Sequence, residues 1–253
     1  MLEHSFIFLD RINHASEQNI WKHAKSWEEF HAIPRIPGVS QARKSFYERR
    51  LLEAADALKE KDISFFSERL PQNQHWRLYD WLKEGAIFLD IETTFFHGDI
   101  TVIGLCDGEK FKPLVRGFNL SRENFLEAIK DARLLITFNG ASFDLPAIEK
   151  YFRMKIPNIP HIDLMHVCHK IGLGGGLKQI EKLIGIGRPE LAADVSGSDA
   201  VWLWQEFQMT KDPAVLEQLI AYNQADVENM RTLAEYAIPR LWRKTHDGMH
   251  ERS

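Results

Sequence analysis

The fold of this chain is decided by residues 86–94, which read A-I-F-L-D-I-E-T-T. Apolar residues lead into Asp90, and this pattern predicts a strand that ends in acidic residues. Asp90 and Glu92 lie two positions apart, so on a strand both carboxylates point to the same face. Two anions held that close repel each other unless a cation lies between them. The stretch therefore predicts a site for Mg²⁺ or Mn²⁺, which prefer oxygen ligands, or alternatively two solvated acids at a strand end.

Composition places the chain among ordinary soluble globular proteins. Its 253 residues are 44% hydrophobic and 27% charged, enough for one large domain with an appendage. A formal net charge of −4 argues against a protein that coats nucleic acid through bulk charge, while a local basic groove is compatible with it. The two cysteines exclude a disulfide framework and a Cys-rich zinc site.

Targeting signals are not evident in the sequence. It has no run of about eighteen apolar residues, which predicts no membrane span. Residues 1–10 are too short and too acidic for a signal peptide, so we expect a cytoplasmic protein. No motif indicates a protein partner.

Residues 1–84 predict an α-helical N-terminal extension. Ser26 and Glu29 have the spacing of a capping box, and residues 40–59 carry apolar side chains at helical spacing. A further helix is predicted for residues 74–82. The long helix also carries a basic cluster, either a solvated face or a nucleic-acid contact, made of Arg43, Lys44, Arg49 and Arg50.

The pattern changes to alternating strands and helices from residue 85 onward. A hairpin-sized turn separates two of the predicted strands, which predicts an antiparallel meander. The expected fold is an α/β domain over residues 85–245, with a mixed sheet and flanking helices, followed by a tail over 246–253. Its strands are predicted at residues 86–94, 100–106, 111–115 and 134–138, and its first helices at 121–131 and 142–154.

Two further acidic elements follow along the chain. Asp144 lies in the first turn of a predicted helix, five residues after Asn139, where it can approach the first two acids or simply cap the helix. Tyr222 and Asp226 lie four positions apart on one helical face, which suits a water-orienting phenol beside a metal-binding carboxylate. The alternative for this pair is a buried tyrosine and a surface acid.

Together these residues resemble a known superfamily. Asp90-Ile91-Glu92, Asn139 with Asp144, and Tyr222 with Asp226 look like the three exonuclease motifs of the DEDD superfamily, which has a ribonuclease-H-like fold. A tyrosine four residues before the last aspartate is the mark of its DEDDy branch. The resemblance covers residues 86–241 and extends to polymerase proofreading domains, family B especially. The N-terminal region resembles the leader of uncharacterised ribonuclease-H-like proteins.

The resemblance implies a role for each residue. Asp90, Glu92 and Asp226 would hold the metal ion that activates water, and Asp90 would bridge to a second ion. Asp144 would act through water, and Tyr222 would orient the nucleophile. Substrate contacts are expected from Asn139, Thr93 and Phe95, the last as a stacking surface or as a packed loop residue.

The expected activity is a metal-dependent 3′–5′ exonuclease on single-stranded DNA or RNA ends, with two Mg²⁺ or Mn²⁺ ions. Two alternatives stay open. One is a structure-directed endonuclease of the same fold, and the other is a catalytically silent nucleic-acid-binding or scaffold module. Candidate phosphate contacts are Lys178, Lys182 and Arg188, while His161 and Asp163 begin an element directed toward the site.

Overall fold

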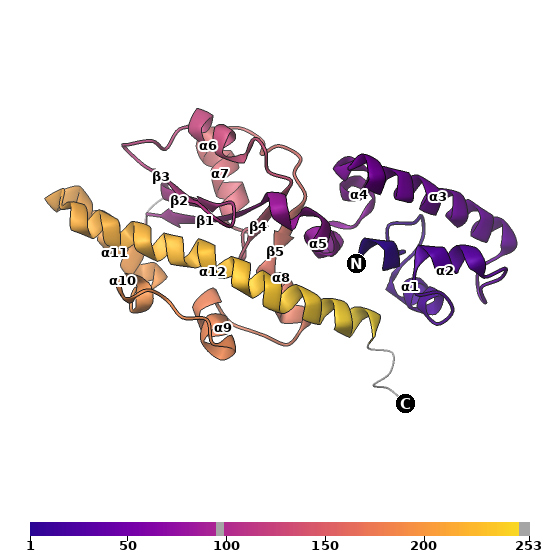
Figure 1. Cartoon of the computed structure of the whole chain (residues 1–253). Helices are drawn as coiled ribbons and strands as arrows, with labels where there is room; N and C mark the ends of the chain where they lie inside the picture. The colour runs from indigo at the N-terminus through magenta and orange to yellow at the C-terminus, as the bar shows by residue number, and fades with distance from the viewer. Residues whose placement is uncertain (95–98, 248–253) are drawn as a thin grey trace. The chain divides into compact units, whose positions relative to one another are not determined.

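The computed structural model describes residues 1–94 and 99–247, which Figure 1 draws as helices and strands. The chain divides into two compact units. One comprises Met1–Trp81 together with the segment from Arg240 onward, and the other comprises Leu82–Pro239. The domain limits expected from the sequence, 1–84, 85–245 and 246–253, remain a prediction, and most of that tail lies outside the described residues.

A five-stranded mixed sheet forms the centre of the Leu82–Pro239 unit, in the order β3-β2-β1-β4-β5. β2 pairs with β1 and β3 in antiparallel fashion, whereas β4 is parallel to β1 and β5. The predicted meander and mixed sheet are therefore confirmed. The strands are β1 Ala86–Thr93, β2 Ile100–Cys106, β3 Phe111–Val115, β4 Leu134–Thr137 and β5 His161–Asp163.

One face of this sheet carries an apolar core. Leu89 and Ile91 of β1 pack with Ile103 of β2 and with Phe125 and Ile148, which come from two helices. Those helices are α6 Arg122–Ile129 and α7 Asp144–Phe152. Side chains alternate along a strand, so Asp90 and Glu92 must point to the other face.

The other face lies under α11 Gly197–Thr210 and α12 Pro213–His246 (Figure 1). Val102 and Val115 of the sheet pack there with Trp204, Phe207 and Tyr222 of the two helices. This is the face on which the acids of β1 lie. The remaining helices of the unit are α8 Leu164–Lys170, α9 Leu177–Ile184 and α10 Glu190–Ala193.

The N-terminal unit is helical, as the sequence predicts. Its helices are α1 His14–Trp21, α2 Trp27–Ala32, α3 Gln41–Glu60 and α4 Ile63–Arg69, and α5 Tyr79–Leu82 follows them. Two predictions are wrong in detail. The stretch expected as one helix is a 3-10 helix, Gln72–Leu78, followed by the single turn α5. The capping box is half formed, because Ser26 accepts from the Glu29 amide while the Glu29 carboxylate accepts from the amide of Lys25.

A buried ion pair holds this unit together. Glu17 and Arg77 are fully buried, and two guanidinium nitrogens each donate to one carboxylate oxygen at 2.8 Å. The backbone amides of Phe6 and Ile7 donate to the same carboxylate, so its lone pairs are well satisfied. Arg77 belongs to the 3-10 helix of residues 72–78, so this network ties that segment to Glu17 of α1.

The basic cluster predicted on the long helix does not form one solvated face. Lys44 is buried, lies 5.2 Å from the ring centroid of Phe30 and pairs with Glu48. Arg50 donates to Glu53 at 2.7 Å. Helical spacing alone does not show which basic side chains turn inward.

Candidate metal centre

The strand β1 places the first two acids side by side on the α11–α12 face of the sheet. Asp90 lies opposite Gly104 in the antiparallel register, and Glu92 lies opposite Val102. Glu92 is only 8% exposed. The predicted common face of the two carboxylates is what the strand register provides.

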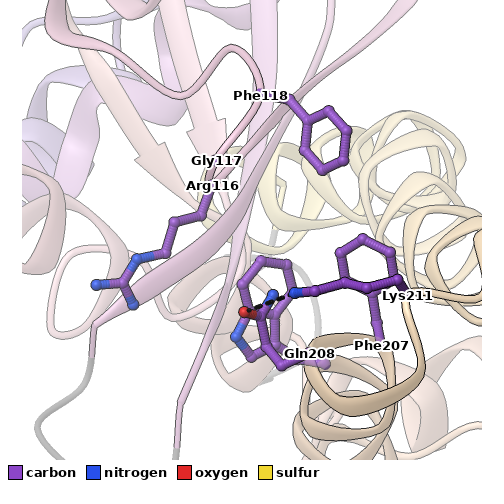
Figure 2. A pocket seen from close by; sticks show the side chains of 7 residues that line it. Arg116, Gly117, Phe118, Phe207, Gln208 and Lys211 are labelled. Carbon is purple, nitrogen blue, oxygen red and sulfur yellow. Dashed lines mark hydrogen bonds between the residues drawn. The ribbon is translucent and has the colours of Figure 1, made fainter.

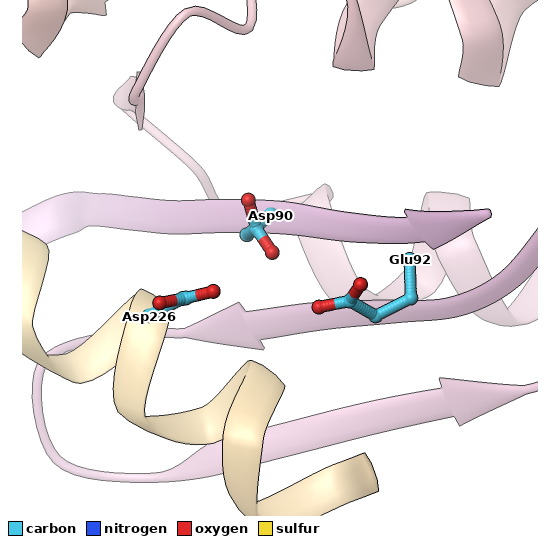
Figure 3. A group of neighbouring side chains, drawn as sticks. All are labelled: Asp90, Glu92 and Asp226. Atoms are coloured by element: carbon cyan, nitrogen blue, oxygen red, sulfur yellow. The ribbon is translucent and has the colours of Figure 1, made fainter. Parts of the chain in front are cut away.

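Asp226 completes an acidic triad from α12. One carboxylate oxygen each of Asp90, Glu92 and Asp226 lies within 4.8 Å of the other two (Figure 3). A six-coordinate magnesium ion binds oxygens at about 2.1 Å, so ligands on opposite sides are about 4 Å apart. Small side-chain rotations bring three oxygens at this spacing onto one ion. The donor set, carboxylate oxygen only, fits Mg²⁺ or Mn²⁺.

Asp144 lies next to the triad but is held differently. It is the first residue of α7, is 3% exposed, and accepts a hydrogen bond from the Ile91 amide at 3.1 Å. Its side chain thus reaches β1 between the two acids of that strand. Burial raises the pKa of Asp144 to about 7. Its role as a fourth ligand remains a prediction.

The electrostatics of the centre call for a cation. Burial, and then the neighbouring carboxylates, raise the pKa values of Asp90 and Glu92 well above the usual range. Burial likewise raises the pKa of Asp226, which Arg188 partly offsets. Without a divalent ion these groups tend to retain protons, and a bound ion would displace those protons and stabilise the fold.

Tyr222 lies one helical turn before Asp226, as the sequence predicts. Burial, followed by the charge of Asp226, raises the pKa of the phenol far above its usual range, so it stays protonated. The Lys178 ammonium lies 4.3 Å from the centroid of the ring. A neutral phenol held beside the triad is a hydrogen-bond donor and acceptor able to orient a water molecule.

Asn223 is a residue of this centre that sequence reasoning missed. Its side-chain amide nitrogen lies 2.9 Å from Asp90 Oδ2 and 3.5 Å from Glu92 Oε1, and donates to both. A Cβ atom on Gly104 would come within 1.9 Å of Asn223 Oδ1. Glycine in the middle of a strand often marks such a close approach, and that was the available signal.

Arg188 has a different role from the one predicted. Its guanidinium donates to both oxygens of Glu181, at 2.6 and 2.9 Å, and also pairs with Asp226. The side chain is 7% exposed. Arg188 is therefore a buried partner of the triad and not a free phosphate contact. Lys178 and Lys182 remain predicted contacts.

The loop after β4 is shaped by Asp163. Its carboxylate accepts from the amide of Asn139 at 2.8 Å and from that of Ala141 at 3.1 Å. Asn139 adopts a φ of 65°, a left-handed conformation that asparagine tolerates. His161 lies 2.9 Å from the Thr137 hydroxyl below this loop. These two residues therefore support the loop, and a substrate contact by Asn139 remains a prediction.

Two other predicted substrate contacts are the last residue of β1 and a residue soon after it in the sequence. Thr93 ends the strand just after a register shift that follows Glu92. Phe95 lies outside the described residues. Their contacts with substrate stay predictions.

Comparison with known proteins gives one result for the fold. Residues 87–238 match the family model described as the RNase_H superfamily, which covers the sheet, the triad and most of α12. No curated protein matches the chain. Among the described residues, no helix combines the length and apolar character that crossing a bilayer requires.

Proposed function

The chain belongs to the RNase H superfamily, and from this premise we propose that it is a metal-dependent 3′–5′ exonuclease acting on single-stranded DNA or RNA ends. The observation that carries the proposal is the triad of Asp90, Glu92 and Asp226 with Tyr222 one turn away. Asp144 and the DEDDy-like order of the motifs support it. Two ions, Mg²⁺ or Mn²⁺, are the proposed cofactors.

The chain's own residues divide the work. Asp90, Glu92 and Asp226 would hold the ions, which when bound would generate hydroxide near neutral pH and neutralise the leaving oxygen. Asn223 orients Asp90 and Glu92 through its amide hydrogens. The Tyr222 phenol would fix the direction of the attacking water, since its proton stays in place at neutral pH.

The test uses end-labelled single strands, DNA and RNA in parallel, with purified protein and Mg²⁺ or Mn²⁺. A ladder that shortens from the 3′ end, absent in Asp226→Ala and in chelator, is the expected result. A circular single strand serves as control, because an exonuclease finds no end on it.

The alternatives give different outcomes in the same assay. Cleavage of the circle would overturn the exonuclease in favour of an endonuclease of this fold. Binding of strands and of Mn²⁺ without any cleavage would favour a catalytically silent module. Undiminished cleavage by Asp226→Ala would contradict the shared metal site.

A further inference from the structure

A cavity of the Leu82–Pro239 unit lies beside the end of β3, against α11 (Figure 2). Its volume is about 510 Å³, within the range of small-molecule and cofactor sites. Phe118, Trp204 and Phe207 supply its aromatic walls, and Arg116 and Lys211 supply positive charge. None of these residues takes part in the acidic triad.

The aromatic side chains of this cavity form a continuous surface with an open end. Phe207 lies 5.8 Å from Trp204 and 6.2 Å from Phe118, measured between ring centroids. Trp204 and Phe207 are buried, whereas Phe118 is 69% exposed. A nucleobase can stack on an exposed aromatic face whatever its sequence identity.

Positive charge lies directly beside the rings. The Lys211 ammonium is 5.5 Å from the centroid of Phe207 and 3.4 Å from the side-chain oxygen of Gln208, a neutral partner. The Arg116 side chain is 39% exposed and pairs with Asp99 at 3.2 Å. Lys211 has no acidic partner among the described ion pairs, although the chain is acidic overall. A lysine of this kind beside aromatic rings fits a nucleotide, whose phosphate would contact the lysine and whose base would contact a ring.

The strand register connects this cavity to the metal centre. Val115, the residue before Arg116, lies opposite Val102, which lies opposite Glu92. Two strand spacings, about 10 Å in all, therefore separate the backbones of Val115 and Glu92. Residues across a pair point to one face, so Val115 and Glu92 share the α11–α12 side of the sheet. Trp204 and Phe207, which line the cavity, pack with Val115 on that side.

We propose that this cavity is a nucleotide subsite for the single-stranded substrate, with a base stacked on Phe118 and a phosphate at Lys211. The inference rests on the proposed nuclease function. It adds a binding position for the part of the strand on the 5′ side of the end that is cleaved. The proposed ligand of the cavity is nucleic acid, and a peptide is the alternative ligand.

The test measures binding separately from cleavage. Fluorescence anisotropy follows a labelled 12-nucleotide strand, DNA or RNA, in chelator. Phe118→Ala should weaken binding about 5- to 150-fold, the range for losing one stacked base. Lys211→Gln should weaken it less and reduce its salt dependence. Leu52→Ala, also an exposed apolar side chain but in the other unit, is the matched control and should change nothing.

Turnover gives a second readout. In Phe118→Ala, KM for the 12-nucleotide strand should rise while kcat stays unchanged, and a dinucleotide too short to reach the cavity should behave as with the wild type. Thermal unfolding checks that each variant is folded. If Phe118→Ala and Leu52→Ala bind strands equally while Asp226→Ala abolishes cleavage, the subsite is wrong and the nuclease stands. If the wild type neither binds nor cleaves, the nuclease itself fails, and the subsite with it.

Discussion

At the scale of single residues, the centre depends on how Asp226 is held. Its carboxylate belongs to the triad and also pairs with Arg188, which pairs with Glu181 as well. An arginine beside a metal ligand neutralises part of the charge that would attract the ion, yet it also fixes the carboxylate in place. The two effects oppose each other, so substitution at Arg188 separates them.

We predict that Arg188→Gln lowers the free energy of unfolding of the metal-free protein by about 3–5 kcal/mol, because Glu181 is left buried without its partner. Addition of Mn²⁺ should then raise Tm more in the variant than in the wild type, since the triad lacks its internal cation. Differential scanning calorimetry with and without Mn²⁺ measures both. Arg231→Gln, in an exposed pair with Glu235, is the control. An equal Mn²⁺ response in Arg188→Gln and wild type would contradict the competition.

Tyr222 tests a weaker contribution. Tyr222→Phe removes the hydroxyl and leaves the triad intact, so cleavage should slow by about 100-fold or less, a cost typical of misplaced reactants. Asp226→Ala should abolish cleavage. Single-turnover cleavage rates of the two variants are measured on the same strand. If Tyr222→Phe loses cleavage as completely as Asp226→Ala, the phenol does more than orient water.

At the scale of elements, β1 and α12 must approach closely for the centre to exist. Gly104 of β2 makes this possible, because Asn223 of α12 fills the space where a Cβ would stand. Asn223 has 0% exposure and its amide nitrogen donates to both Asp90 and Glu92, so it cannot retreat without losing its contacts to the acids.

Gly104→Ala should therefore destabilise the protein by about 1–3 kcal/mol, the usual cost of overpacking, and weaken Mn²⁺ binding measured by calorimetry. Adding Asn223→Ala should restore stability toward wild type without restoring Mn²⁺ affinity, a non-additivity expected of contacting residues. The matched control is Gly174→Ala, where a Cβ meets nothing within 4 Å. If the double variant loses as much free energy of unfolding as the two single variants lose together, the clash between the new Cβ and Asn223 is not the cause.

Local signals account for what the sequence could predict. Short apolar runs and a short turn specify β1 to β3, and acids two apart on a strand must share a face. The contacts that sequence reasoning missed act over long range, since Asn223 and Asp90 are 133 positions apart and Arg188 and Asp226 are 38 apart. Nothing in local spacing identifies such partners. The 3-10 helix Gln72–Leu78 shows the same limit, because Arg77 within it pairs with Glu17, which lies 60 positions away.

At the scale of the whole molecule, the buried acids couple pH, metal and stability. Asp144 has a folded pKa of about 7, above its ordinary value, and the pKa values of Asp90, Glu92 and Asp226 are also raised. Between the unfolded and folded pKa values the folded chain binds more protons than the unfolded chain. The stability of the metal-free protein should therefore fall as pH rises from about 4 to 7. Surface acids with lowered pKa values, such as Asp107, act only below this window.

Hydrogen exchange of β1 amides at pH 5, 6 and 7, corrected for intrinsic exchange rates, follows the Leu82–Pro239 unit without interference from the other unit. Without metal, the opening free energy should decrease with pH, and Asp144→Asn should flatten that decrease because one titrating group is gone. With saturating Mn²⁺ the slope should reverse, since the ion competes with protons for the same oxygens and binds better as they leave. If the opening free energy of the metal-free protein instead increases with pH, the acids are already ionised in the folded state, because a cationic side chain of the chain stabilises them. Arg188, paired with Asp226, would be the first residue to substitute in that case.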